Sequence, residues 1–317
     1  LKNNFPSVEI IVLSFIYPFV RKNYTWNDVP VIAYNGRAFR GPLKYFLWKN
    51  IRHGLNELHR QQDIIGLLSF WCGECAWLAK NFADKNNLLH FCWILGQDAK
   101  KENRWVRKID PAGSELIALS DFLQTEFEKN HGIKPAHLVT PGINTSMFSE
   151  EKKEKVIDVL GAGSLIPLKQ YHIFIEIIAE LKKKQPCIRA AICGKGPEEK
   201  KLQALIKKLG LEENIELKGE LPHVEVLKLM QQSKIFLHPS AYEGFVVVCI
   251  EALYAGAKVV SFVKPMNREI HKWHIASSQE EMVEITRNLL KEEKETTRVL
   301  FKSIDETAKE MMQLFGN

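Results

Sequence analysis

Short hydrophobic segments alternate with amphipathic segments along almost the whole chain. The hydrophobic runs predict strands at 8–15, 29–34, 64–70, 90–95, 115–120 and 137–140, and again at 156–163, 188–194, 214–219, 234–240 and 257–262. Segments of helical period lie between them and predict helices at 42–61, 74–85, 121–130, 169–184, 197–209, 223–232 and 279–312. Near-continuous apolar strands that alternate with helices are typical of parallel sheets covered on both faces.

One charged stretch, 150–155, divides this alternation into two similar series. A chain of 317 residues is long enough for about two domains of roughly 150 residues each. We therefore expect an α/β fold with two Rossmann-like domains, 1–152 and 153–290, and a cleft between them. In this class, ligands bind beyond the carboxyl ends of the strands, next to helix N-termini.

The charge is distributed unevenly. Lys and Arg number 44 and Asp and Glu 38, a formal net charge of +6, and residues 1–60 contain nine basic and only three acidic side chains. The whole surplus therefore lies in the first fifth of the chain. Ordinary hydrophobic (45%) and charged (26%) fractions exclude disorder and fibrous repeats, and so small a surplus does not predict nucleic-acid binding. No apolar run reaches the roughly 18 to 20 residues that span a bilayer.

Six cysteines are too few for a disulfide-rich scaffold, and several lie in apolar runs, as free buried thiols do. This usage predicts a reducing, cytoplasmic compartment. Cys72-Gly-Glu-Cys75 has the spacing of a redox pair or of half a zinc site. The sequence has no second such pair to complete a zinc site, and redox chemistry is the weaker alternative.

Two glycine turns follow predicted strands in the second half. They are Gly161-Ala-Gly163-Ser-Leu-Ile-Pro-Leu-Lys169 and Gly194-Lys-Gly196-Pro. Small residues at such turns let a backbone approach a ligand closely, and Lys169 could neutralise a phosphate. No predicted strand ends in a GxGxxG fingerprint with an acid about 20 residues later, which argues against a dehydrogenase. Each turn alone is also compatible with a simple tight turn.

A third segment, 238–256, contains two glutamates eight positions apart. Strand propensity is high from Phe245 to Ile250, but the Glu-Gly before this run and the glycine cap after it predict a buried helix instead. The start of that helix would offer free N–H groups and a positive dipole to an anion. Along a helix, Glu243 and Glu251 would be roughly 12 Å apart, which suits two carboxylates that grip different parts of one long ligand. The alternative is one solvated and one capping carboxylate.

These residues resemble the retaining glycosyltransferases of family 4, which have the GT-B fold. The Glu-x7-Glu signature of that family appears as Glu243…Glu251 within PSAYEGFVVVCIEALYAGAKVV. GKGPEEKKLQALIKKLGLEENIELKGEL (194–221) matches its stretch from the glycine-proline turn to the base-binding loop, and 118–148 looks like the last strand and helix of its N-terminal domain, with the interdomain segment after them. The resemblance covers most of 65–290 and is strongest over 156–262.

The resemblance implies a nucleotide-diphosphate sugar as donor, held mainly by the second domain, with no cofactor and no metal. Lys169 would contact the diphosphate together with the helix start, and Glu243 would contact the sugar hydroxyls. Catalysis by these two residues would be mostly electrostatic. Glu251 would bind the ribose, and backbone groups of 219–221 would border the base. The implied donor-binding residues are Gly163, Ser164, Gly194, Gly196, Gly219, Glu220, Leu221, Gly244, Phe245, Val246 and Glu251.

The chain departs from the family pattern in three places. Ser164 stands where the family often has arginine, which leaves Lys169 as the main cation. No counterpart of the family's opening strand and glycine-rich loop precedes Val8, so we expect a first β-α unit of several dozen residues to be missing. We also expect a C-terminal helix over 291–317 to pack back on the first domain.

The third departure concerns the acceptor side. Many members have His-Gly-x-Asp after a strand of the first domain, whereas this chain reads Leu95-Gly96-Gln97-Asp98. The usual histidine is absent. Its contacts would therefore fall to the backbone at Gly96, to Gln97 or to Asp98.

Segment 42–60 carries apolar residues at helical spacing and basic residues elsewhere. A basic amphipathic helix can lie on an anionic membrane surface, which predicts a peripheral membrane contact through 42–60. The alternative is that the apolar stripe packs on the sheet and the cations are solvated. The apolar positions are Leu43, Phe46, Leu47, Ile51, Leu55 and Leu58.

Together these features predict a retaining glycosyltransferase that moves a sugar from a nucleotide-diphosphate sugar to a glycan or lipid-linked acceptor. The expected setting is cell-envelope polysaccharide or glycolipid synthesis, in the cytoplasm or on the inner face of the membrane. Two alternatives stay open: a GT-B-fold sugar-nucleotide epimerase, and a degenerate sugar-nucleotide-binding module without turnover.

Overall fold

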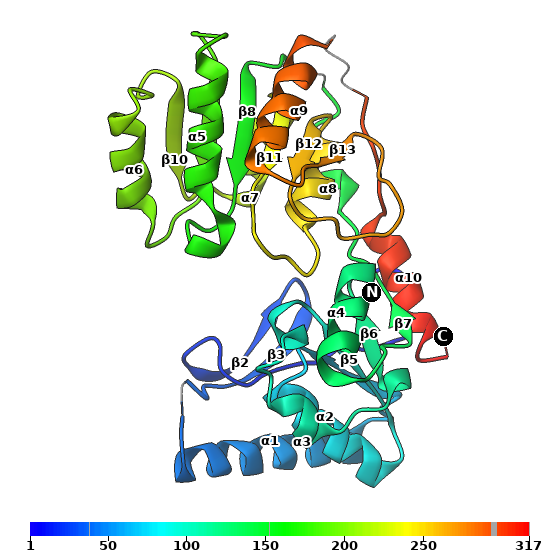
Figure 1. Cartoon of the computed structure of the whole chain (residues 1–317). Coiled ribbons are helices and arrows are strands. Elements are labelled where there is room, and N and C mark those ends of the chain that lie inside the picture. The colour runs from blue at the N-terminus through cyan, green and yellow to red at the C-terminus, as the bar shows by residue number, and fades with distance from the viewer. Residues whose placement is uncertain (38, 152, 293–296, 317) are drawn as a thin grey trace. The chain divides into compact units, whose positions relative to one another are not determined.

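The structure is a computed structural model that describes residues 1–37, 39–151, 153–292 and 297–316 (Figure 1). The chain forms two compact units: Leu1–Thr140 together with Asp305–Asn317, and Pro141–Ile304. The sequence predicts the division at 152/153; residue 152 lies outside the described residues, and the units divide at Thr140 instead.

The second unit is built on one six-stranded sheet in which every pair of neighbouring strands is parallel, in the order β10-β9-β8-β11-β12-β13 (Figure 1). The strands are β8 Ile157–Ala162, β9 Ala190–Cys193, β10 Ile215–Gly219, β11 Ser233–His238, β12 Lys258–Ser261 and β13 Trp273–Ile275. The helices are α5 Tyr171–Lys182, α6 Glu199–Lys208, α7 His223–Gln231, α8 Val247–Tyr254 and α9 Gln279–Lys291. Short 3₁₀ turns are η3 Thr145–Met147 and η4 Pro167–Lys169.

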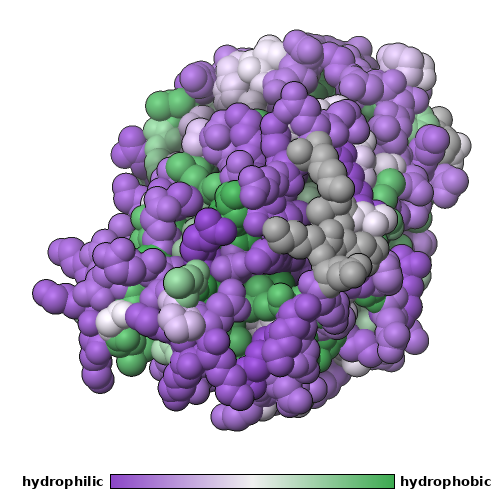
Figure 2. All heavy atoms as spheres, turned by 90° about the horizontal axis from the view of Figure 1, so that it is seen from above, coloured by the Kyte–Doolittle hydropathy of each residue, from purple (hydrophilic) through white to green (hydrophobic). Residues whose placement is uncertain are grey.

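The core of the second unit is a continuous cluster in which α5 supplies the largest side chains. Phe174, Ile175 and Ile178 are fully buried there against Ile192 of β9 and Ile235 of β11. Helices on both faces thus cover the apolar strands, as a parallel sheet requires. Hydrophilic residues cover most of the face seen in Figure 2, where hydrophobic residues appear only in small groups.

Two helical predictions in this unit have different outcomes. The predicted helix in 238–256 is confirmed against strand propensity, because α8 runs from Val247 to Tyr254. It begins later than predicted, since Val246 is the non-helical N-cap. The predicted single helix 279–312 is wrong: α9 ends at Lys291, and a separate helix, α10, spans Ile304–Gln313. Residues 293–296 of the prediction lie outside the described residues.

The first unit contains two separate sheets. β1 Val12–Ser14 and β3 Val29–Tyr34 are parallel, and β2 Arg21–Trp26 pairs antiparallel with β3. β4 Gly66–Phe70, β5 Leu89–Ile94, β6 Leu116–Ala118 and β7 His137–Leu138 form a parallel sheet in that order. The helices are α1 Pro42–Gln61, α2 Glu74–Asn86, α3 Trp105–Ile109, α4 Asp121–His131 and α10, with 3₁₀ turns η1 Gln97–Ala99 and η2 Gly113–Glu115.

Helix α1 has the predicted bounds, and the middle of its apolar stripe lies in the core of this unit. Leu47, Ile51 and Leu55 are buried in one cluster with Leu78 and Phe82 of α2. The alternative of packing against the protein therefore holds for these three positions. Leu43 and Phe46, at the start of the helix, are exposed. Within the described residues, no helix is both long and apolar enough to cross a bilayer.

Candidate active site

A cavity of about 490 Å³ lies in the second unit where four strands end. Its wall comes from the segments that follow β8, β9, β10 and β11, as expected for the carboxyl edge of a parallel sheet. We call it the β8–β11 cavity. It brings together most of the residues predicted for a donor, namely Gly163, Ser164, Lys169, Gly194, Glu220, Leu221, Glu243, Phe245, Val246 and Glu251.

The two predicted glycine turns lie backbone against backbone at the floor of this site. Gly194 has φ +142°, and a Cβ atom there would lie 1.8 Å from the carbonyl oxygen of Gly163. The Gly163 N–H donates to Cys193 at 2.9 Å, and the Gly194 N–H donates to Gly219 at 2.7 Å. Glycine is therefore needed here mainly because the loops that follow β8, β9 and β10 approach one another closely. Gly196 is similar, since a Cβ there would lie 2.4 Å from the Leu165 carbonyl oxygen.

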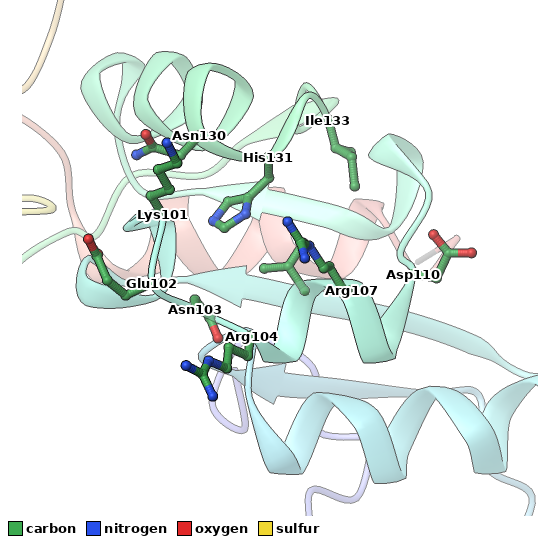
Figure 3. Close-up of a pocket in the computed structure, with 10 residues that line it drawn as sticks. Lys101, Glu102, Asn103, Arg104, Arg107, Asp110, Asn130, His131 and Ile133 are labelled. Carbon is green, nitrogen blue, oxygen red and sulfur yellow. The ribbon is translucent and has the colours of Figure 1, made fainter.

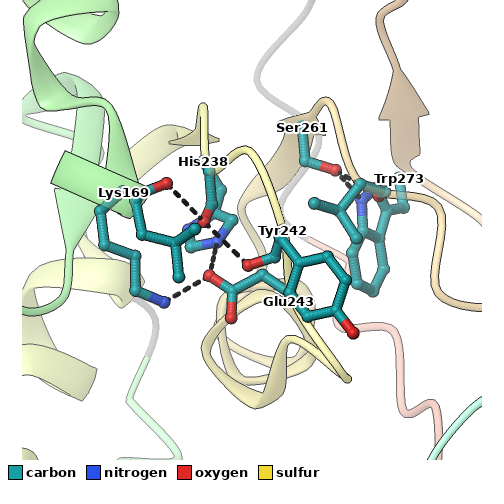
Figure 4. A network of polar contacts seen from close by, with 9 residues as sticks. Lys169, His238, Tyr242, Glu243, Ser261 and Trp273 are labelled. Carbon is teal, nitrogen blue, oxygen red and sulfur yellow. Dashed lines mark hydrogen bonds and ion pairs between the residues drawn. The ribbon is translucent and has the colours of Figure 1, made fainter. Parts of the chain in front are cut away.

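Lys169 ends η4 rather than lying in helix α5, and its ammonium forms an ion pair with Glu243 Oε1 (Figure 4). The segment before Glu243 is attached to η4 by a backbone bond from the Ala241 N–H to the Leu168 carbonyl at 3.0 Å. His238, at the end of β11, contacts the same Glu243 oxygen through Nε2 at 3.0 Å. A carboxylate held between a lysine and a histidine thus lies in the cavity wall.

The electrostatics of this trio favour an ionised Glu243. Burial raises the carboxyl pKa, but the bond from His238 and the charge of Lys169 outweigh it and lower the pKa to about 2. His238 is 1% exposed, and burial lowers its own pKa, so we assign it as neutral with the proton on Nε2, donated to Glu243. The ring also stacks on Phe236, 14° from parallel. At neutral pH the cavity therefore holds one fixed anion and one fixed cation side by side.

The N-terminal turn of α8 forms another part of the wall. Val246, Val247 and Val248 line the cavity, and no side chain caps the helix. The first N–H groups of a helix have no partner within the helix, and they carry the positive end of its dipole. This part of the wall therefore suits an anionic group.

The second glutamate lies on α8, one turn after its start. Burial raises the pKa of Glu251, and His223 at the start of α7 contacts its carboxylate at 2.8 Å through Nε2. Glu243 precedes α8 and Glu251 lies within it. The two carboxylates therefore line different parts of the same cavity. This is the arrangement expected for two groups that grip different parts of a ligand.

Several residues predicted for the site do not line the β8–β11 cavity. Gly219 ends β10 with φ +67°, and Gly244 is a buried residue between Glu243 and α8. On the acceptor side, Gly96, Gln97 and Asp98 follow β5 in the first unit.

The carboxylate of Asp98 is occupied by the backbone. It is buried and accepts hydrogen bonds from the N–H groups of Cys72 at 2.9 Å, Leu95 at 3.1 Å and Gly96 at 2.7 Å. Burial raises its pKa and these bonds oppose that shift. Asp98 therefore shapes the loop after β5, and an acceptor contact by this loop stays a prediction for Gly96, Gln97 and Asp98.

Two site residues escaped the sequence analysis. His238 carried a signal, because it lies in a predicted strand, 234–240, five positions before Glu243. His223 carried none, since its partner Glu251 is 28 positions away and only the tertiary structure brings them together.

The environment of the Cys72–Cys75 pair does not favour a redox site. Both thiols are free, and burial with the neighbouring charge of Glu74 raises the pKa of Cys75 to about 12. Such a thiol is not a nucleophile at neutral pH. Among the described residues, no cluster of three or more His, Cys, Asp or Glu side chains could hold a metal ion.

Comparison with known proteins gives a family match over residues 142–303, to the family described as glycosyl transferases group 1. Among curated proteins, the chain is 27% identical over 262 residues to the D-inositol 3-phosphate glycosyltransferase of Corynebacterium urealyticum, covering 71% of this chain and 59% of that protein. It is 33% identical over 89 residues to the phosphatidylinositol N-acetylglucosaminyltransferase gpi3 subunit of Schizosaccharomyces pombe, covering 28% and 20% of the two proteins. The chain thus spans less than two thirds of the length of these relatives.

A solved structure with a similar fold is Anabaena Alr3699/HepE in complex with UDP and glucose. The TM-score is 0.67 at 17% identity, over 91% of this chain and 84% of that one. At this identity the likeness concerns the fold alone, and it extends over both units.

Proposed function

The chain belongs to the glycosyl transferases group 1 family and has the GT-B fold, and we propose that it transfers a sugar, with retention of anomeric configuration, from a nucleotide-diphosphate sugar to a glycan or lipid-linked acceptor. One observation carries the proposal. The β8–β11 cavity joins an ionised glutamate, a lysine and an uncapped helix start within a single wall. A phosphate-linked sugar needs both cationic and hydroxyl-binding groups, and the wall offers both.

In the proposed complex the diphosphate lies against Lys169 and the first turn of α8. Its negative charge competes with Glu243 for the lysine, so donor binding loosens the ion pair seen in Figure 4. Glu243, still ionised and held by His238, then accepts hydrogen bonds from the sugar hydroxyls. Glu251, oriented by His223, accepts from the ribose hydroxyls.

In the transfer step the bond between the anomeric carbon and the phosphate oxygen breaks, and the acceptor oxygen forms its bond to the same carbon on the same face. The acceptor proton leaves on the departing phosphate oxygen. Lys169 and the helix N–H groups stabilise the negative charge that develops there. Such prearranged charge is worth about 10²- to 10³-fold in rate for each donor group removed.

The test is release of nucleoside diphosphate from a panel of nucleotide sugars by the full chain, with saccharide and lipid-linked acceptors. We expect release with at least one donor, loss of release in Glu243→Gln, and normal release in Glu225→Gln. Glu225 is an exposed α7 carboxylate outside the cavity wall and is the matched control. Isomerised donor without nucleotide release would favour the epimerase, and nucleotide binding without turnover the degenerate module.

We further propose that the acceptor is membrane-linked and that the start of α1 lies at an inner membrane surface. Leu43, Tyr45 and Phe46 are exposed there, and Lys49 is exposed on the same helix. Exposed apolar and basic residues together suit an anionic interface. Sedimentation with anionic vesicles should decrease in a Leu43→Ser/Phe46→Ser variant, and equal sedimentation of both proteins would contradict the proposal.

A further inference from the structure

A second cavity, of about 420 Å³, lies entirely in the first unit and has no role in the function proposed above. It opens between the segment after η1, helix α3 and the end of α4 (Figure 3). We call it the α3–α4 pocket. The residues that matter for its chemistry are Lys101, Arg104, Arg107 and His131, with Glu102 and Asp110.

The basic side chains of this pocket are not neutralised by the protein. Among the described residues, no ion pair or hydrogen bond engages the side chains of Lys101, Arg104 or Arg107. The two acids of the wall, Glu102 and Asp110, lie at opposite ends of the group in Figure 3. The space between them is therefore left with a surplus of positive charge.

His131 adds a buried polar atom that lacks a partner. Its Nε2 is buried and forms no hydrogen bond with any described residue. The ring packs on Phe127, with centroids 4.7 Å apart, and backbone groups of 98–100 also interact with it, so the ring is held in place. The neighbouring Asn130 side chain is already engaged, with the Ala99 carbonyl and Glu126. Figure 3 shows the His131 ring directed toward the same space as the Arg107 guanidinium.

A buried ring nitrogen without a partner is unfavourable unless something outside the chain completes its hydrogen bond. An anion can do so, because it accepts from an imidazole N–H while it pairs with the cations nearby. A guanidinium suits two oxygens of a phosphate at once, and lysine adds a point charge. The group thus favours a phosphate over a single-atom anion.

We propose that the α3–α4 pocket binds the phosphate group of a phosphate monoester. Arg107 and Lys101 pair with its oxygens, His131 donates to one of them, and Arg104 lies at the rim. The cavity volume leaves room for a substituent such as a sugar on the fourth oxygen. The proposal concerns binding alone and stands whether or not the β8–β11 cavity supports transfer.

Titration calorimetry on the full chain tests this, with inorganic phosphate, a hexose 1-phosphate and the neutral hexose as probes. We expect both phosphates to bind and the neutral hexose not to. Arg107→Ala should weaken phosphate binding at least about tenfold, as expected for loss of a charge-assisted pair. Lys129→Ala removes an equal charge from exposed α4 surface outside the pocket and should leave binding unchanged.

Two further variants distinguish binding in this pocket from binding elsewhere on the chain. His131→Phe keeps the ring packed on Phe127 but removes the nitrogen, and it should weaken phosphate binding without lowering the melting temperature. Lys169→Ala removes the cation of the β8–β11 cavity and should leave hexose 1-phosphate binding intact. The proposal is overturned if neither phosphate binds at millimolar concentration, if Lys169→Ala abolishes binding, or if Arg107→Ala and Lys129→Ala behave alike.

The phosphate can belong to a soluble sugar phosphate or to a lipid headgroup, and vesicles distinguish the two. Vesicles with phosphatidic acid, compared with vesicles of neutral lipid, report the lipid source. Retention on the acidic vesicles that Arg107→Ala removes and Lys129→Ala preserves supports a lipid phosphate. Retention that is equal in both variants would show that this pocket does not hold the lipid.

Discussion

Strands of similar sequence character are buried to very different degrees in this protein, and one strand from each unit shows the contrast most clearly. In the second unit, β8 and β9 are buried along almost their whole length. In the first unit, β4 reads equally apolar, yet most of its residues are only half-buried and Phe70 is exposed. β1 is also at most half-buried. An apolar run therefore predicts that a strand forms but not how deeply it is buried.

The cause lies in the sheets. β8 is central in a sheet of six strands and has a hydrogen-bonded neighbour on each side, β9 and β11. β4 and β1 are edge strands of two separate sheets. Burial on both faces requires neighbours and covering helices, and these are properties of the assembled unit. The β8–β11 cavity lies at the end of the deeply packed central strand β8, which suits precise placement of charged groups.

The largest effect expected from this contrast is on the core. Leu160 of β8 is fully buried, whereas Leu68 of β4 is half-buried. Leu160→Ala should lower the free energy of unfolding by about 2–5 kcal/mol, and Leu68→Ala by roughly half as much. Hydrogen exchange measured by mass spectrometry follows each unit separately. Equal losses in both variants would contradict the contrast.

Buried and exposed ion pairs give the next largest difference. Asp158 of β8 is 3% exposed, pairs with Lys234 at 2.6 Å and accepts from the Arg189 N–H at 2.8 Å. Asp158→Ala should cost about 2–3 kcal/mol because a lysine and a backbone donor lose their partner. In the first unit, Asp84→Ala should change stability by less than about 0.5 kcal/mol, since that aspartate is largely exposed beside Lys80. Urea unfolding of both variants measures this.

A pH effect on stability is expected from one buried histidine of the first unit. His90 is buried against Ser69, and burial lowers its pKa to about 4. The unfolded chain takes up this proton below about pH 6.5 and the folded chain only near pH 4, so its stabilising effect is complete above pH 6.5 and lost as the pH falls toward 4. Between pH 6.5 and 4 the wild type should lose up to about 3 kcal/mol of unfolding free energy in the first unit through this group, and His90→Gln should not show this loss.

The control for that titration is His53→Gln, at an exposed position of α1, which should leave the pH dependence of the first unit unchanged. If wild type and His90→Gln lose stability in parallel between pH 6.5 and 4, His90 is not the group that titrates.

The smallest effect is expected at the start of α1. Phe46 is exposed while Leu47, the next residue, is buried in the core of the first unit. Phe46→Ser should change stability by less than about 0.5 kcal/mol, and Leu47→Ser should cost several-fold more. Thermal unfolding of the two variants decides whether the buried face of α1 is correctly assigned. A larger loss in Phe46→Ser would reverse the assignment.

Local sequence determined a large part of the fold and of the candidate site. The helix at 42–61 and most strand cores follow from hydrophobic period, and α8 follows from the Glu-Gly before it and the glycine after it, which outweigh the β-branched residues between. The position of Glu243 before a helix and of Glu251 within it follows from the same local signals and from their spacing. β2, with the polar sequence Arg-Lys-Asn-Tyr-Thr-Trp, was not predictable because its pairing with β3, not its hydrophobicity, makes it a strand.

Tertiary structure alone decided which groups meet. Lys169 and Glu243 are 74 positions apart, and their pairing depends on the register of β8 and β11 and on the bond from Ala241 to η4. The same holds for His223 with Glu251. It holds too for Asp98, whose carboxylate binds the backbone of the loop after β4 at Cys72. A sequence encodes side-chain chemistry and local conformation, but contacts between distant segments depend on the energy of the whole packed unit.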